Sequence, residues 1–416
     1  MIINSSETVS SDYRMPTKKA THQLTKQHNR DLILKIFFDN QSISRAEIAR
    51  STKLTRATVS DMVANLIDEG LVKEVGYGSS IGGRSPILLS LIPDSRYLIG
   101  LNLAQDKFIA AVVNLRGEIK ETCEAPVNGN NGEQALQTVY QILDQLVEKD
   151  WSPIVGIGVG TPGLVNTNEG VVVTAVNLDW HDLPLAHLLE SRYDLPVSVL
   201  NDSQAMAIGE FVYSGMYKSD SSLIVVNVGH GVGAGILING HIFQGDGGAA
   251  GEIGHITVLE NGVLCRCGKH GCLETVASTR AIVQRAQTLT GEFVRSTLAA
   301  NPQNISIESI ESAYLADDPL ARRVIDESGR YLGFSIASLI GTLNIQTIVL
   351  TGEMVCFGET WLQSIREYIR QAALSRMAQD TRIEMGKLDF RGCILGASAS
   401  MLLNSYSLLF IKTDIN

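Results

Sequence analysis

The first quarter of the chain carries apolar residues at the spacing of amphipathic helices. From Asn29 onward they recur at positions i, i+3 and i+4, which places them on one face of a helix. Ser44 and Thr55 each precede a further stretch of this kind, and a hydroxyl side chain at such a position caps a helix N-terminus. Gly70 follows the third stretch and is a typical helix stop. The pattern therefore predicts three short helices.

Two segments of alternating apolar and polar residues, 71–77 and 87–91, come after these helices. Such alternation predicts β-strands, and the stretch between them is too rich in glycine and serine to belong to either strand. Three helices followed by a hairpin of strands are typical of a winged helix-turn-helix. We expect this domain to span residues 25–93, after a flexible polar tail, 1–24, that shows no periodicity.

The rest of the chain alternates strand patterns with amphipathic helices. The strands that we expect are 97–103, 108–114, 118–124, 154–159, 197–200, 223–228, 234–238 and 347–350. A helical pattern covers 134–148, and the last third is mostly helical. This alternation predicts an α/β body of two lobes. We expect the first lobe at 94–200, together with a C-terminal helix at 396–416, and the second lobe at 201–395.

The net charge of −10 is unevenly divided along the chain. Residues 1–92 hold 12 Lys and Arg against 9 Asp and Glu, whereas the remainder holds 22 against 35. A basic head on an acidic body predicts a nucleic-acid contact confined to the head. No apolar run reaches the roughly 18 residues that a membrane span needs, and the first residues do not resemble a secretion signal. We therefore expect a cytoplasmic protein that makes no membrane contact.

The predicted third helix and the wing carry side chains suited to DNA. In a helix-turn-helix, the N-terminal residues of this helix face base edges in the major groove. With the apolar stripe turned to the core, the outward side chains near that end are Thr55, Arg56, Thr58 and Ser60. Arg84 lies in the glycine-rich wing, and a narrow A·T-rich minor groove attracts arginine. We expect operator binding; a winged helix that binds only protein is the alternative, which Arg84 and the basic head disfavour.

Three of the six cysteines fall within eight residues, a density that indicates a metal site rather than a secreted disulfide framework. With one histidine the spacing is His255-x9-Cys265-x-Cys267-x4-Cys272. One imidazole and three thiolates complete a tetrahedral zinc site, and four protein ligands leave no position for an activated water. The cofactor that we expect is therefore a structural zinc, and three reduced thiols in a loop are the alternative.

Acidic and amide side chains lie beside this cluster and at the end of one predicted strand. Glu252 precedes His255 by three residues, so the two share a face if the turn is helical, and Glu274 follows the last cysteine. Asn201 and Asp202 end a strand, where ligand sites of α/β proteins usually lie. Each residue alone is typical of a helix cap or a surface charge. Together they suit the hydroxyl groups of a sugar.

Six segments of the chain resemble motifs of the ROK family, whose repressors and sugar kinases share one fold. They are IGVGTPGLVN (157–166), NLDWHDLPL (177–185), NDSQAMAIGE (201–210), GVGAG (231–235), GGAAGEIGHITV (247–258) and CRCGKHGCLE (265–274). The GEIGH and CxCGxxGCxE motifs are highly specific. The resemblance implies an actin-like, sugar-kinase-like body over most of residues 97–400, with zinc on the four cluster residues. The sugar contacts that it implies are Asn201, Asp202, Glu252, His255 and Glu274.

The chain departs from the family's kinases at both phosphate-binding turns. Those kinases carry Asp-x-Gly-Gly-Thr after the first strand, whereas residues 102–106 read NLAQD, without the leading carboxylate or the glycines that let backbone N–H groups reach phosphates. The second turn, usually Gly-Thr-Gly, reads GHG at 229–231. The resemblance makes Asp202 the match of the kinases' general base. Without a phosphoryl donor we expect Asp202 only to contact the ligand, and we expect no enzyme activity.

The N-terminal winged helix resembles that of the family's repressor branch, and the kinases lack it. We expect a repressor of carbohydrate-utilisation genes that binds a symmetric operator as a homodimer or homotetramer. A monosaccharide, either a hexose or a pentose such as xylose, would bind between the lobes and change the spacing of the paired heads. Two alternatives remain: a ROK sugar kinase that retains ATP-dependent activity, and a regulator controlled by a protein partner.

Overall fold

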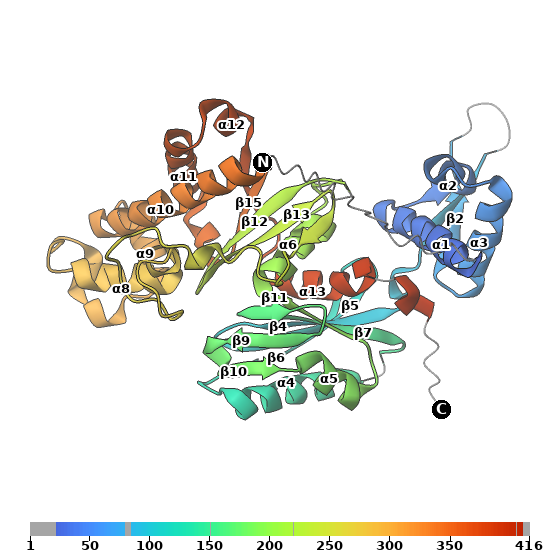
Figure 1. The fold of residues 1–416 in the computed structure, drawn as a ribbon, viewed down its shortest axis with the longest axis horizontal. Coiled ribbons are helices and arrows are strands. Elements are labelled where there is room, and N and C mark those ends of the chain that lie inside the picture. The colour runs from blue at the N-terminus through green and yellow to red at the C-terminus, as the bar shows by residue number, and fades with distance from the viewer. Residues whose placement is uncertain (1–21, 80–84, 150, 219, 405, 411–416) are drawn as a thin grey trace, which may run out of the picture. The chain divides into compact units, whose positions relative to one another are not determined.

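The computed structural model contains two compact units (Figure 1). It describes residues 22–79, 85–149, 151–218, 220–404 and 406–410. The first unit comprises Met1–Asp68 and Val72–Ser90, and the second comprises Glu69–Leu71 and Leu91–Asn416. Each unit has buried apolar residues of its own.

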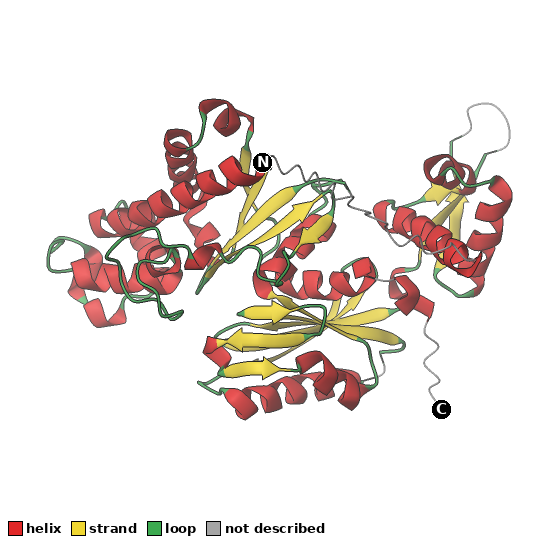
Figure 2. Cartoon of the chain, in the orientation of Figure 1, coloured by secondary structure: helices red, strands yellow, loops and turns green. Residues whose placement is uncertain are grey.

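Three helices and a small sheet make up the described part of the first unit (Figure 2). They are α1 (His22–Asp39), β1 (Ile43–Ser44), α2 (Arg45–Thr52), α3 (Arg56–Asp68), β2 (Val72–Tyr77) and β3 (Ile87–Leu91), with the strands in the order β1-β3-β2. Ser44 caps α2 in a capping box: its backbone N–H donates to the carboxylate of Glu47 at 2.9 Å, and its Oγ accepts from the Glu47 N–H. Val59, Val63 and Leu66 form the buried stripe of α3. The predicted winged helix-turn-helix is confirmed.

Five strands form the sheet of the first lobe of the second unit. In spatial order they are β11 (Val197–Asn201), β7 (Ile154–Thr161), β4 (Tyr97–Leu103), β5 (Lys107–Asn114) and β6 (Ile119–Pro126). Helices α4 (Gly132–Val147) and α5 (Leu185–Tyr193) share the buried core on one face of this sheet (Figure 1). A small antiparallel sheet contains β8 (Leu164–Asn166), β9 (Val171–Ala175) and β10 (Trp180–Leu183). Because β4, β7 and β11 are parallel, their carboxyl ends meet at one edge.

A second five-stranded sheet forms the other lobe. In spatial order its strands are β14 (His241–Phe243), β13 (Val232–Ile238), β12 (Leu223–Val228), β15 (Thr347–Thr351) and β16 (Arg382–Met385). The helices are α6 (Asp202–Tyr213), α7 (Glu274–Ala277), α8 (Thr279–Leu289), α9 (Ile307–Leu315), α10 (Pro319–Leu343), α11 (Gly358–Ala372) and α12 (Ser375–Asp380). One face of the sheet packs on α6, and the other on the core that α10 and α11 line. The predicted two-lobed α/β body is confirmed.

The helix α6 crosses α13 (Arg391–Asn404) at backbone contact. A methyl group added at Gly209 would overlap the carbonyl oxygen of Gly392, and one added at Gly396 would overlap that of Ala205. Only glycine leaves enough room at such a crossing, because its α-carbon carries no side chain. The two helix backbones therefore touch without side chains between them.

The same helix, α13, lies equally close to the sheet of the first lobe. A methyl group added at Gly100 in β4 would overlap the carbonyl oxygen of Ile394, and one at Gly158 in β7 would overlap that of Ala397. Helix α6 packs instead on β12 and β13 of the second lobe. The α6–α13 pair therefore joins the two lobes through close-packed backbone.

Several element boundaries differ from the sequence prediction. The expected helix at 396–416 is instead α13, which begins at Arg391 and ends at Asn404, followed by a 3-10 turn at Tyr406–Phe410; residues 411–416 lie outside the described part of the chain. The sequence also missed β14 and β16, which lie at the two edges of their sheet. Strands of three or four residues at an edge show too little alternation to be recognised.

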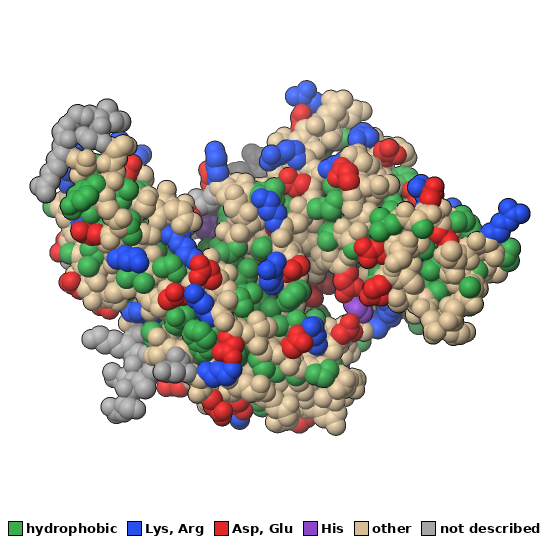
Figure 3. Space-filling model, turned by 180° about the vertical axis from the view of Figure 1, so that it is seen from behind, with side chains coloured by type: hydrophobic (Ala, Val, Ile, Leu, Met, Phe, Trp, Pro, Cys, Tyr) green, Lys and Arg blue, Asp and Glu red, His purple; other side chains and the backbone are tan. Residues whose placement is uncertain are grey.

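The surface mixes charges of both signs. On the face drawn in Figure 3, Lys and Arg side chains lie among Asp and Glu side chains. Partly exposed ion pairs among the described residues include Arg192 with Asp144 at 2.7 Å and Arg376 with Asp380 at 2.9 Å. Pairs of this kind contribute about 0–1 kcal/mol each to stability. Among the residues that the structure describes, no helix is long and apolar enough to cross a membrane.

The helix crossing predicts the effect of one added methyl group. Gly396→Ala should lower the free energy of unfolding by about 2–3 kcal/mol, because the methyl must push the two helices apart. Gly341→Ala is the matched control: Gly341 is an exposed residue of α10 with open space around it, and alanine should be neutral or stabilise by about 0.5–1 kcal/mol. Urea unfolding measures both, and equal stability of the two variants would contradict the close contact.

Candidate functional site

The first turn of α3 presents the polar side chains that the sequence predicts for DNA. The Thr55 hydroxyl caps the helix, since its Oγ1 accepts from the backbone N–H of Thr58 at 3.2 Å. Thr55, Arg56 and Ser60 are exposed and Thr58 is half-buried, all away from the buried stripe of the helix. Arg84, the predicted wing contact, lies outside the described residues.

Two further cations lie just before this helix and were not among the predicted DNA contacts. Arg50 is exposed in the last turn of α2. Lys53 is exposed in the connection to α3, with the left-handed backbone angle φ of 58° that ends α2. Cationic side chains of a helix-turn-helix commonly contact DNA phosphates. The position of Arg50 and Lys53 just before the third helix could therefore have identified them from the sequence.

In the second unit, Asn201 fixes the junction between β11 and α6. Its Oδ1 accepts from the backbone N–H groups of Ser203 at 2.9 Å and Gln204 at 3.4 Å, which caps the helix. Its Nδ2 donates to the carbonyl of Gly163 at 2.9 Å. Most of the hydrogen-bonding capacity of Asn201, a predicted sugar contact, is therefore used within the protein.

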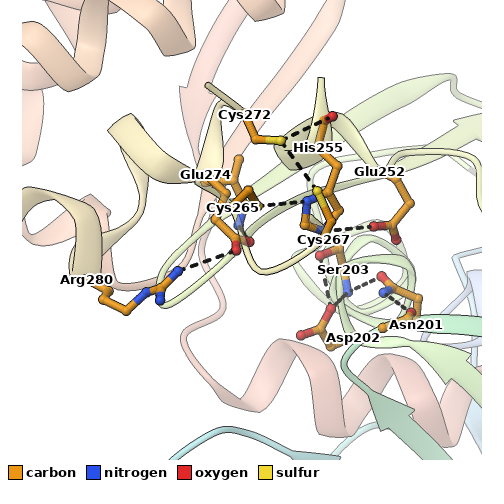
Figure 4. A network of polar contacts seen from close by, with 12 residues as sticks. Asn201, Asp202, Ser203, Glu252, His255, Cys265, Cys267, Cys272, Glu274 and Arg280 are labelled. Atoms are coloured by element: carbon orange, nitrogen blue, oxygen red, sulfur yellow. Dashed lines mark hydrogen bonds and ion pairs between the residues drawn. The ribbon is translucent and has the colours of Figure 1, made fainter. Parts of the chain in front are cut away.

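Asp202 is the first residue of α6, and its carboxylate lies near those of Glu252 and Glu274 (Figure 4). Its Oδ1 accepts from the backbone N–H of Ser203 at 2.6 Å and from the Ser203 hydroxyl at 3.2 Å. Burial, with a smaller effect of Glu274, raises the pKa of Asp202 to about 6. The pKa of Asp202 is raised although the two hydrogen bonds from Ser203 favour the charged form, because the effect of burial outweighs them.

Glu252 and Glu274 complete a cluster of three carboxylates. Burial, and then the charges of Asp202 and Glu274, raise the pKa of Glu252 to about 7. Glu274 accepts from the backbone N–H of Val232 at 3.3 Å and lies 3.9 Å from Arg280. The structure thus brings together the three acidic residues among the five predicted sugar contacts. Neighbouring acceptors of this kind are suited to the hydroxyl hydrogens of a polyol.

The metal-ligating candidates converge on one point. One ligand atom from each of His255, Cys265, Cys267 and Cys272 lies within 4.8 Å of the others. The Sγ of Cys265 is 3.6 Å from Nδ1 of His255, and the Sγ atoms of Cys267 and Cys272 are 3.6 Å apart. All three cysteines are free thiols. One nitrogen and three sulfur donors fit a borderline-soft ion such as Zn²⁺, so these residues could hold a metal.

The metal cluster and the carboxylates share His255. Its Nδ1 faces the cysteines, whereas its Nε2 lies 3.9 Å from the carboxylate of Glu252 (Figure 4). His255 ends the 3-10 turn Ile253–His255, and Glu252 directly precedes this turn. The two side chains therefore lie on the same face, as predicted. An ion on Nδ1 would fix the ring and leave Nε2–H as a hydrogen-bond donor beside Glu252.

Comparisons with known proteins agree with these features. The ROK family pattern matches residues 98–403, and a winged helix-turn-helix DNA-binding pattern matches 29–73. A putative xylose repressor from Caldicellulosiruptor sp. (strain Rt8B.4) is 36% identical over 92% of this chain and 97% of its own length. A glucokinase from Halalkalibacterium halodurans is 36% identical over 72% of this chain and 93% of its own length. A ROK family transcriptional regulator, described as a homolog of the E. coli MLC protein, has a crystal structure that matches 93% of this chain and 100% of its own, with 27% identity and a TM-score of 0.80.

The raised pKa of Asp202 predicts a stability change that depends on pH. An acid whose pKa is raised on folding destabilises the fold once the pH exceeds its usual value of 3.8, and the full effect is present above pH 6. Asp202→Asn should therefore raise the free energy of unfolding by about 1–3 kcal/mol at pH 8 and have little effect at pH 4.

Asp144→Asn is the control of opposite sign, since the hydrogen bond from Arg192 lowers the pKa of Asp144. Removing that charge should destabilise the protein at pH 8. Thermal unfolding at both pH values measures the two variants. A loss of stability for Asp202→Asn at pH 8 would contradict the desolvation of this carboxylate.

Proposed function

Because this chain belongs to the ROK family, we propose that it is a transcriptional repressor whose operator binding is changed by a monosaccharide. One observation carries this proposal: a winged helix-turn-helix unit precedes a family body that keeps the carboxylate cluster but has lost the glycine-rich turn typical of the kinases. The relative named a putative xylose repressor makes xylose the first effector to test.

The carboxylates of Asp202, Glu252 and Glu274 would accept hydrogen bonds from sugar hydroxyls. Hydrogen bonds from a neutral polyol to these half-buried carboxylates are favourable, because a charged acceptor forms a stronger hydrogen bond than a neutral one. The Nε2–H of His255 would donate to a sugar oxygen beside Glu252. Asn201 would act mainly by holding Asp202 at the start of α6.

The sugar would act by linkage. Asp202 directly follows β11 of the first lobe, whereas Glu252 and Glu274 belong to the second lobe, so a bound sugar would favour one relative position of the lobes. The effect on operator affinity is limited to the difference in sugar affinity between the two states, typically about 1–3 kcal/mol. A homodimer or a dimer of dimers would present paired heads to a symmetric operator.

We infer that the protein is not a kinase. Residues 102–106 lack the carboxylate and glycines of the family's phosphate loop, and Asp106 would place a negative charge near a triphosphate. A retained sugar kinase activity is the second candidate function, favoured by the 36% identity to a glucokinase. ATP consumption with an aldose as substrate distinguishes the two.

We infer that a zinc ion occupies the cluster of His255 and three cysteines. Four protein ligands would leave no site for substrate water, so the ion would stabilise the loop and orient His255. Reduced cysteines and operator DNA are both found in the cytoplasm, so we infer that the protein is cytoplasmic.

Two variants should separate the functions of the two units. Arg56→Ala should weaken binding to an operator duplex selected from a random library by at least about tenfold, the loss of one good base contact, and leave sugar affinity unchanged. Asp202→Ala should abolish the sugar response and leave sugar-free operator binding intact. Fluorescence anisotropy with labelled operator measures both. Equal loss of both activities in either variant would contradict the division of labour.

Removal of one thiol tests the metal site. Wild-type protein prepared with zinc should carry about one ion per chain, and Cys265→Ser should carry almost none and melt at lower temperature, because three ligands rarely hold a structural zinc. Cys356→Ser, an exposed cysteine outside the cluster, is the matched control and should keep its zinc. Equal zinc content in the two variants, measured by mass spectrometry, would exclude this site.

A further inference from the structure

The turn between β12 and β13, residues Gly229 to Val232, is held by contacts at both ends. The carbonyl of Gly229 accepts from the backbone N–H of Thr279 at 2.9 Å, and its N–H donates to the carbonyl of Gly231 at 2.9 Å. The N–H of Val232 donates to Oε2 of Glu274. A methyl group added at Gly231 would lie only 2.9 Å from the same oxygen. The turn therefore packs directly against a carboxylate of the cluster.

The side chain of this turn, His230, lies between two carboxylates from different lobes. Its Nδ1 is 3.0 Å from Oε1 of Glu353, which begins a 3-10 turn after β15 in the second lobe. Its Nε2 is 3.7 Å from Oδ1 of Asp106, which lies between β4 and β5 in the first lobe. His230 thus forms an ion pair within its lobe and another across to the first lobe.

The charges around His230 favour its protonated form. The hydrogen bond with Glu353 raises the pKa of His230, and Asp106 adds to this effect, whereas burial and the positive charge of Arg266 oppose it. In turn, His230 lowers the pKa of Glu353, and the negative charge of Glu308 opposes that. A protonated imidazole carries a positive charge and an N–H on each ring nitrogen, so only this form attracts both carboxylates at once.

We propose that His230 is a positioning residue that couples the carboxylate cluster to the closure of the two lobes. This inference rests on the proposed function, because Glu274 is one of the assigned sugar contacts. A sugar bound to Glu274 restricts this carboxylate, which accepts from the N–H of Val232 in the same turn. The position of the turn then determines the distance from His230 to Asp106 in the first lobe. The residue occupies the position where the family's kinases have the threonine of Gly-Thr-Gly.

The test measures the affinity for xylose and for glucose by calorimetry in the full-length protein, at pH 6 and at pH 8. His230→Gln should bind the sugar about two- to tenfold more weakly than wild type at pH 6, the loss expected for two partly exposed ion pairs. Asp106→Asn should cause part of this loss, because it removes only the pair between the lobes. His187→Gln, an exposed histidine of α5, is the matched control and should bind as wild type does.

The pH dependence separates coupling from a merely structural role. A group whose pKa is raised stabilises its paired state fully below its usual value, here 6.5, and loses that effect as the pH rises past the raised pKa. The affinity ratio of wild type to His230→Gln should therefore fall toward one at pH 8. His230→Lys keeps a positive charge at both pH values, so its affinity should exceed that of wild type at pH 8. Asp202 and Glu252 also titrate here, but they do so in every variant and cancel in the ratio.

The outcomes are distinguishable. If wild type binds a sugar and His230→Gln binds it equally at both pH values, this proposal fails and the proposed function stands. If His230→Gln is weaker by the same factor at both pH values and lysine does not restore binding, the residue is structural and the coupling is refuted. If wild type binds none of the sugars, the proposed function fails, and the coupling fails with it.

Discussion

The backbone contact between α6 and α13 determines where the three clustered carboxylates lie. The glycines at the crossing bring α6 close enough to α13 for the two helices to join both sheets. Because α6 begins at Asp202, the same contact places that carboxylate where the parallel strands of the first lobe end. Glu252 and Glu274 then approach from the second lobe. A bulkier residue at the crossing would separate the lobes and the carboxylates together.

Three neighbouring carboxylates repel one another, which lowers the stability of the fold. The same three carboxylates form the proposed ligand site. Burial and mutual repulsion raise the pKa values of Asp202 and Glu252 to about 6 and about 7, so both groups hold protons more tightly than in water. A neutral polyol can donate further hydrogen bonds to these carboxylates. Under the proposed function, the protein keeps an electrostatically unfavourable cluster because it supplies acceptors for the sugar.

The sequence predicted the fold well where patterns are local. The strands 97–103 and 223–228 match β4 and β12 to the residue, and Ser44 caps α2 as expected. The cluster around His255 could also be inferred, because its cysteines are close in the chain. Asn201 shows the limit of this reading: the same amide that suits a sugar also suits a helix cap, and in the structure it caps α6.

Contacts between distant segments could not be predicted in this way. Asp106, His230 and Glu353 are more than a hundred residues apart from one another, and each looks like an ordinary surface charge until the two sheets are in place. The sequence did show that both phosphate turns differ from those of the kinases. It did not show that the residues replacing them pair with each other, because that pairing depends on the packing of both lobes.

The most direct test titrates sugar into wild-type protein bound to labelled operator, with and without ATP. Operator anisotropy and ADP formation are measured in the same samples. The account predicts that sugar alone changes the anisotropy of the operator, that ATP does not alter the midpoint of this change, and that no ADP is formed. Steady conversion of ATP to ADP with the sugar, or operator binding that no sugar affects, would contradict it.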